Sequence, residues 1–189
     1  MKLRKCELEQ FTVFKQADFE FSEGINIFIG VNGTGKSHLM KLLYAILSSA
    51  RVARGTASGN GDVVQGKLGD RLSRKLAGVF RPDEDAVGRL VARTVGKSKA
   101  SVRLIGDDQA TLQFRLTTES NIHVDEAAVA VQERSIFIPS REAFAMYEGF
   151  AAAYQDRELS FDETYFDLCL AMSANPLKGK RLAAANALV

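Results

Sequence analysis

The alternation of apolar and polar residues near the N-terminus predicts β-structure. Residues 3–14 and 19–21 are rich in strand-forming side chains, and the Ser-Glu-Gly step at 22–24 is a turn signal. Residues 25–29 then form a nearly continuous apolar run, which is typical of a strand buried on both faces of a mixed or parallel sheet. We expect two short strands followed by a core strand.

A helical period replaces this pattern after a glycine-rich loop. Apolar residues recur every three or four positions over 39–47, which predicts a helix that begins near Lys36 and ends before Gly55. Residues 55–66 contain several glycines and few packing side chains, so we expect a mobile surface loop there.

The middle of the chain predicts a helix and then an antiparallel sheet. Leucines and a valine at helical spacing over 68–79 indicate an amphipathic helix that ends at Pro82. Residues 101–107 and 109–118 alternate around a Gly-Asp-Asp turn, which predicts a hairpin, and residues 121–125 favour a third strand.

The remaining elements follow from three local signals. Residues 135–139 form a second apolar strand that ends in a proline, and aromatic residues form one stripe over 142–155, which we interpret as core packing. Ser160 and Glu163 have the spacing of a capping box, so a helix is predicted to run from there to about Ser173.

The loop between the predicted core strand and the first helix carries the chemistry. Residues 30–37 read Gly-Val-Asn-Gly-Thr-Gly-Lys-Ser and match the Walker A pattern G-x-x-x-x-G-K-[ST] at every fixed position. In this motif the glycines let successive N–H groups converge on the β-phosphate, the lysine reaches the β- and γ-phosphates, and the serine hydroxyl holds Mg²⁺. The predicted ligands of ATP are Gly30, Asn32, Gly33, Thr34, Gly35, Lys36, Ser37 and His38, with Ser37 also binding Mg²⁺.

Composition and charge refine the picture. The 189 residues carry a net charge of +2, but residues 67–103 hold ten basic and four acidic side chains, whereas residues 119–167 hold three basic and eleven acidic ones. The basic segment is compatible with a nucleic-acid surface, and solvated helix faces give the same count. Cys6 and Cys169 lie in apolar patterns without metal-ligand or redox spacing. With no signal peptide or membrane-length apolar run, these features predict a cytoplasmic protein with no membrane contact.

Two further residues were weighed as functional candidates. Arg141 follows the second core-type strand and could approach a γ-phosphate or a partner subunit, but an arginine at a helix start is more often a surface residue. His123 lies in an alternating strand with no second metal ligand nearby, so we do not expect it to bind metal.

The residues around the loop also resemble a family. Residues 11–14, 19–26 and 30–37 look like the opening of ABC-type ATPases of the SMC/RecF kind, and within these the AAA-type ATPases related to overcoming-lysogenization-defect (OLD) nucleases. The resemblance covers residues 1 to about 50 well, and 137–142 more loosely. It implies an α/β P-loop NTPase fold, with a side sheet of antiparallel strands beside the nucleotide and helices at the C-terminus.

One departure from the family pattern concerns hydrolysis. Members need a Walker B strand, four apolar residues followed by Asp-Glu, and an LSGGQ-like signature. Three segments come nearest to a Walker B strand, and a glycine, a histidine or a capping box interrupts each: residues 104–108, 122–126 and 159–163. No catalytic residue is therefore assigned. Asp125 and Glu126 would be the first carboxylates to examine if turnover were found.

Together these observations predict one N-terminal ATP-binding lobe over 1–189, built from segments 1–53, 54–134 and 135–189. By resemblance, this lobe would belong to a longer ATPase whose partner is a second ATPase subunit or the missing C-terminal half. The resemblance also implies homo-oligomerisation of the complete protein and a role that involves DNA or phage defence. The alternatives are a nucleotide-dependent regulatory module without turnover and a P-loop small-molecule kinase. We also expect the apolar faces of Ile27, Ile29, Ile136 and Ile138 to lack cover.

Overall fold

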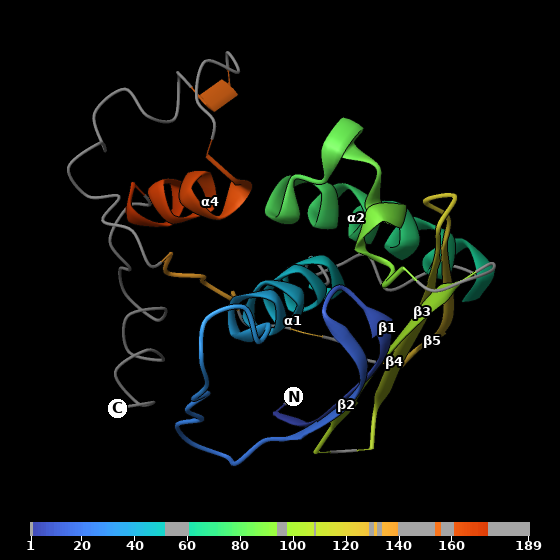
Figure 1. Cartoon of the computed structure of the whole chain (residues 1–189), viewed down its shortest axis with the longest axis horizontal. Coiled ribbons are helices and arrows are strands. Elements are labelled where there is room, and N and C mark those ends of the chain that lie inside the picture. The colour runs from blue at the N-terminus through green and yellow to red at the C-terminus, as the bar shows by residue number, and fades with distance from the viewer. Residues whose placement is uncertain are drawn as a thin grey trace, which may run out of the picture. The chain divides into compact units, whose positions relative to one another are not determined.

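The computed structural model of the chain describes residues 2–51, 61–93, 98–107, 109–128, 131, 134–139, 154–155 and 161–173, and side chains of 61–65 are excluded. Two compact units divide the chain between Ser135 and Ile136. The first unit holds the sheet, two long helices and the glycine-rich loop (Figure 1).

Five antiparallel strands form one sheet in the first unit, in the order β2-β1-β3-β4-β5. Their bounds are Leu3–Phe11 for β1, Phe14–Glu20 for β2, Lys99–Gly106 for β3, Thr111–Thr117 for β4 and Ile122–Ala127 for β5. The predicted hairpin and third strand are confirmed. The first strand ends earlier than predicted, because Thr12 and Val13 form the β1–β2 turn and the chain re-enters the sheet at Phe14.

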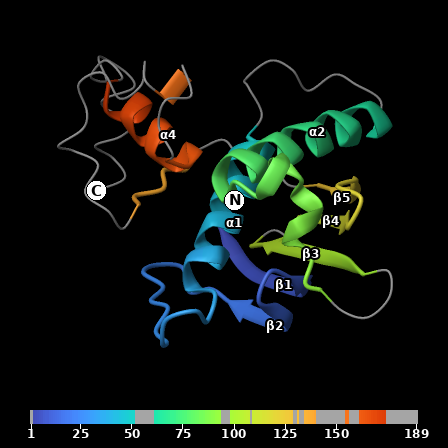
Figure 2. The same ribbon diagram turned by 45° about the horizontal axis from the view of Figure 1, so that its top comes forward.

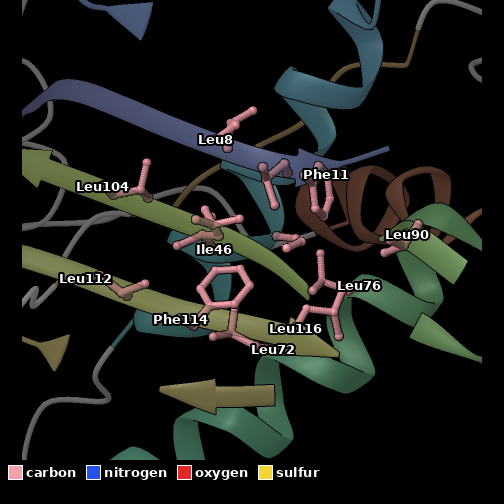
Figure 3. Packing of buried hydrophobic residues seen from close by; sticks show 14 of the residues in the cluster. Leu8, Phe11, Ile46, Leu72, Leu76, Leu90, Leu104, Leu112, Phe114 and Leu116 are labelled. Atoms are coloured by element: carbon pink, nitrogen blue, oxygen red, sulfur yellow. The ribbon is translucent and has the colours of Figure 1, made fainter. Parts of the chain in front are cut away.

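Only one face of this sheet is apolar, and α1 and α2 cover it. Helix α1 spans Lys36–Ala50 and α2 spans Gly61–Phe80 (Figure 2). Period-two alternation in β3 and β4 and helical spacing in α1 and α2 send apolar side chains to the same layer (Figure 3). This core includes Leu8, Phe11, Leu39, Leu42, Ile46, Leu68, Leu72, Leu76, Val79, Leu104, Leu112, Phe114 and Leu116. Both predicted helices are confirmed.

The opposite face of the sheet is polar. Glu7 of β1 lies 2.7 Å from Lys5 and 3.6 Å from Arg103 of β3, and Arg115 of β4 pairs with Asp125 of β5. These ion pairs remain accessible to solvent, and such pairs contribute little net free energy. This sheet therefore buries one face only, as a solvated antiparallel sheet does.

Helix α2 starts earlier than the sequence predicted. Residues 61–66 belong to its first turns rather than to a surface loop, and residues 52–60 lie outside the described part of the chain. After α2 come two short 3₁₀ turns, η1 (Asp83–Asp85) and η2 (Val87–Leu90). The second turn packs tightly against the β4–β5 connection, because a Cβ on Gly88 would lie 2.3 Å from the Thr118 carbonyl oxygen.

The prediction of two core strands is wrong for the described residues. Neither 25–29 nor 134–139 forms a strand, and Ile25, Ile27 and Ile29 are 88%, 77% and 92% exposed. Phe28 packs against Phe19 and Phe21, so one side of the first segment is covered. A continuous apolar run is typical of a strand that is covered on both faces. In the described sheet, β2 is the edge strand, and no described strand pairs with residues 25–29.

The second unit contains helix α4, Glu163–Met172, which ends near the predicted Ser173. Its N-cap is Asp162, whose carboxylate accepts from the Thr164 backbone N–H at 3.0 Å. The cap was therefore wrongly predicted at Ser160, which lies outside the described residues. Tyr154 stacks on Phe166 with ring centroids 5.0 Å apart, while the rest of the predicted aromatic stripe lies outside the description.

Candidate nucleotide-binding site

The glycine-rich loop connects the extended segment 25–31 to α1. Gly33 and Gly35 have φ angles of +83° and +92°, a backbone region that other residues adopt at a cost. These two left-handed positions turn the chain sharply before the helix begins at Lys36. Gly35, which the pattern requires, and Gly33, which stands at a variable position of the pattern, therefore both lie where the backbone favours glycine.

Lys36 lies across the loop rather than away from it. Its Nζ donates to the carbonyl oxygens of Gly30 and Val31, each at 2.7 Å. The Thr34 hydroxyl also donates to the Val31 carbonyl, at 2.9 Å. These bonds hold both ends of the loop together around the ammonium group, so a full positive charge lies at the loop and is available to an anion.

The start of α1 is open to an anion. Gly35 is the N-cap and provides no side-chain cap, and the first turn contains no acidic residue. Leu39 N–H makes the first helical bond, to the Gly35 carbonyl at 2.9 Å. The backbone N–H groups before Leu39 thus have no intrahelical acceptor, and the positive end of the helix dipole favours a phosphate there.

The predicted nucleotide ligands occupy different positions around this loop. Asn32, Thr34 and Ser37 are exposed, and Ser37 in the first turn of α1 can turn its hydroxyl toward a cation at the phosphates. Hydroxyl and phosphate oxygens are ligands that Mg²⁺ accepts, so these residues fit an ATP–Mg²⁺ complex. The structure brings Gly30, Lys36 and Thr34 together, whereas Asn32 makes no hydrogen bond to any residue that the structure describes.

His38 lies on the inner side of α1 rather than facing the loop. Its ring meets Phe80 of α2 edge-on, with centroids 5.7 Å apart, and its Nδ1 is buried without a hydrogen-bond partner among the described residues. Burial lowers the pKa of His38, and the nearby positive charge of Lys41 lowers it further. The imidazole therefore acts as a neutral packing group in this geometry.

The tip of the β1–β2 hairpin forms one wall of the loop. A Cβ on Gly35 would lie 2.5 Å from Phe14 Cζ and 2.6 Å from Val13 Cγ2, so both side chains lie directly on this glycine. Sequence reasoning missed Val13 and Phe14 as part of the site. The signal in the sequence is the Phe-Thr-Val-Phe run at 11–14, which carries the family resemblance and also contains the two side chains that lie on Gly35.

A pocket of about 260 Å³, whose lining side chains are mostly apolar, adjoins the loop. It is lined by the aromatic rings of β2, the segment 27–29 and the start of α1, and Lys36 is its charged lining side chain. Ile27 and Ile29 contribute to the lining although both are largely exposed. The site is thus apolar on one side and cationic on the other.

Three carboxylates of the Walker B candidates make structural contacts among the described residues. Asp107 accepts from the Lys2 N–H at 3.1 Å at the β3–β4 turn, and Asp162 caps α4. Asp125 bonds Arg115, whose proximity lowers the pKa of Asp125, at a register irregularity between β4 and β5. Glu126 follows on the same edge strand.

The remaining candidates are His123, Arg141 and the two cysteines. His123 is exposed on β5, and the described residues contain no cluster of three or more groups that could hold a metal. Arg141 lies outside the described residues. Both cysteines are buried, and burial raises the pKa of Cys6 to about 12, which makes its thiol unreactive at neutral pH.

Residues 1–166 of the chain match the AAA ATPase domain family. The chain belongs to that family. This AAA ATPase domain is also 28% identical over 111 residues to the DNA replication and repair protein RecF of Streptococcus suis, covering 59% of the chain and 26% of that protein. It is 43% identical over 56 residues to RecF of Renibacterium salmoninarum, covering 29% of the chain and 14% of that protein.

A third match is the DNA double-strand break repair Rad50 ATPase of Methanosarcina mazei, 35% identical over 52 residues, which cover 28% of the chain and 5% of that protein. The domain is thus an SMC/RecF-like P-loop ATPase domain, and the matched segments span 26%, 14% and 5% of these relatives' lengths. A solved structure titled "Structural biochemistry of ATP-driven dimerization and DNA stimulated activation of SMC ATPases" aligns over the whole of both chains at 12% identity with a TM-score of 0.39, too low to carry an argument. The narrower resemblance to OLD-related ATPases stays a prediction.

Proposed function

We propose that this AAA ATPase domain binds ATP with Mg²⁺ at the loop 30–37 and does not turn ATP over by itself. The observation that carries the proposal is the arrangement of Lys36, whose ammonium spans the loop to Gly30 and Val31 beside an uncapped helix start. A loop with this shape has a preorganised anion site and needs little rearrangement to accept the β-phosphate. Ser37 is the residue that would hold Mg²⁺.

Turnover requires more than this loop supplies. Hydrolysis needs a carboxylate that orients water and groups that neutralise charge developing on the γ-phosphate. Among the described residues, Asp107, Asp125 and Asp162 are each engaged in structural contacts. We infer that the catalytic groups come from a second ATPase subunit or another part of a longer protein, as in a dimeric ATPase. The regulatory alternative would lack turnover in every assembly.

Calorimetric titration with ATP and Mg²⁺ tests the proposal. Lys36→Ala should weaken binding by about 1.5–3 kcal/mol, the usual free energy of hydrogen bonds to a charged group. The matched control is Lys99→Ala, which removes an exposed lysine at the start of β3. Equal affinity in the parent and Lys36→Ala would refute the assignment, and a kinase would instead transfer phosphate to an added acceptor.

A second candidate function is binding of duplex DNA, and the exposed side of α2 favours it. Lys67, Arg71 and Arg74 recur at helical spacing on that side, are exposed, and have no carboxylate partner in the part of the chain that the structure describes. Arg71 and Arg74 reach only backbone carbonyls, at 3.5 and 3.4 Å. Such a cationic stripe can neutralise neighbouring phosphates, and RecF and Rad50 are named for DNA repair. A role in phage defence and a cytoplasmic location remain predictions from the sequence.

A further inference from the structure

The end of α2 contacts both β1, whose hairpin lies on the nucleotide loop, and α1, which follows the loop. The Phe80 ring meets the ring of Phe11, at the end of β1, edge-on with centroids 5.8 Å apart. Its other edge contact is His38, in the first turn of α1. One residue of α2 therefore packs simultaneously against the hairpin that lies on Gly35 and against the helix that carries Lys36.

Two sets of polar contacts reinforce this junction. Lys41 Nζ of α1 donates to the Val79 carbonyl at 3.1 Å and so satisfies an acceptor in the last turn of α2. Beyond α2, the backbone of η2 holds the hairpin tip, because Thr12 N–H donates to the Leu90 carbonyl at 2.7 Å. The Ala92 N–H donates to the Gln10 carbonyl at the same distance.

The hairpin tip is held in an unfavourable state. Gln10 and Thr12 have φ angles of +50° and +49°, although neither is glycine. Gln10 Oε1 and Thr12 Oγ1 are also buried without hydrogen-bond partners among the described residues, like Nδ1 of His38. Strain and unsatisfied polar atoms persist where surrounding packing imposes them, and they gather at functional sites.

We propose that Phe80 is a positioning residue for the nucleotide loop, and that nucleotide binding and the order of the last turn of α2 depend on each other through its ring. The proposal rests on the proposed ATP site. The Phe80 ring sets the spacing between the strained hairpin tip and α1, and this spacing places Val13 and Phe14 over Gly35. Phosphate binding at the loop fixes the same spacing from the other side, so it orders the helix end that Phe80 terminates.

Two measurements on the full chain test this coupling. Hydrogen exchange of amides in 77–81 is followed with and without ATP and Mg²⁺, and ATP affinity is measured for Phe80→Leu. Phe114→Leu is the matched control, because Phe114 is fully buried in β4 and loses the same aromatic ring. The parent should show slower exchange at 77–81 when ATP binds. Phe80→Leu should lose that protection and bind ATP about fivefold or more weakly, the lower end of usual coupling effects.

Phe114→Leu should lower the melting temperature yet keep ATP affinity within about twofold, because Phe114 is not a ring partner of Phe80 among the described residues and substitutions without shared contacts usually act independently. The inference is overturned if the parent binds ATP with no change at 77–81, if Phe80→Leu binds like the parent, or if Phe114→Leu loses as much affinity. The parent measurement decides alone should Phe80→Leu not fold. A parent that does not bind ATP refutes the proposed function itself, together with the coupling.

Discussion

Two glycines of the nucleotide loop share a left-handed backbone but differ in their surroundings. Gly35 lies under Val13 and Phe14, whereas a Cβ on Gly33 would meet nothing within 4 Å. At Gly33 an alanine would pay only the backbone cost, and at Gly35 it would also collide with the hairpin. Glycine is therefore favoured at Gly33 by the backbone alone, and at Gly35 by the backbone and by the close side chains of the hairpin. Only the folded structure shows this difference.

We therefore predict unequal effects of alanine at these positions. Gly33→Ala should lower the free energy of unfolding by about 1–2 kcal/mol, the cost of a left-handed conformation. Gly35→Ala should lower it further and also displace the hairpin tip. Urea denaturation of both variants measures the difference. Equal losses would show that the hairpin does not lie on Gly35.

The burial of His38 predicts a pH dependence. Its pKa in the folded chain lies below the ordinary value of 6.5, so the unfolded chain binds more protons as pH falls through that value. Stability should therefore decrease with falling pH and become level below the folded pKa. Urea denaturation at about pH 8 and about pH 5 should show a larger loss for the parent than for His38→Gln. An equal loss in both proteins would place the titration elsewhere.

Among the helices and strands, those with a single apolar face were predicted correctly from the local pattern of the sequence. Helix α2 and strands β3 and β4 could be predicted from the sequence because their buried residues follow the period of the element itself. Examples are Leu68, Leu72 and Leu76 of α2. The prediction of a strand at 25–29 is wrong because an apolar run forms a buried strand only where neighbouring strands from elsewhere in the fold pair with it. The contact of Phe80 with His38 joins two elements far apart in sequence, and such a contact leaves no local signal.

The exposed segment gives a direct test of this difference. Ile29 is 92% exposed, whereas Leu104 in β3 is fully buried. Ile29→Thr should change the free energy of unfolding by less than about 0.5 kcal/mol, as surface substitutions do. Leu104→Ala should lower it by about 2–5 kcal/mol through lost burial and a cavity. A large loss for Ile29→Thr would mean that other residues of the chain cover the segment.

The basic stripe of α2 predicts a salt-dependent interaction with DNA. Reversing Lys67, Arg71 and Arg74 to glutamate should abolish binding to a short duplex at low salt, and parent binding should weaken steeply as salt rises. The control reverses three exposed basic residues on other elements, Lys15, Arg89 and Lys99, and so makes the same change in net charge. Equal loss in both triple variants would indicate a general charge effect, and no parent binding would leave α2 with a solvated face.

For the molecule as a whole, ATP binding and ATP hydrolysis require different sets of residues. The proposed phosphate contacts come from residues 30–37, which are close in sequence, so a local pattern could predict them. A catalytic carboxylate would lie on a separate Walker B strand, and none of the three nearest segments matches that pattern. The described carboxylates with assigned roles cap, pair or close turns.

The most direct measurement incubates an excess of the purified 189-residue protein with a trace of radiolabelled ATP and Mg²⁺, then separates and identifies the bound nucleotide. We expect the parent to retain intact ATP and Lys36→Ala to retain little. A parent that retains no ATP would contradict ATP binding at the loop. Conversion of ATP to ADP and phosphate near 1 s⁻¹ by the parent but not by Lys36→Ala, within the usual range for enzymes, would contradict binding without turnover.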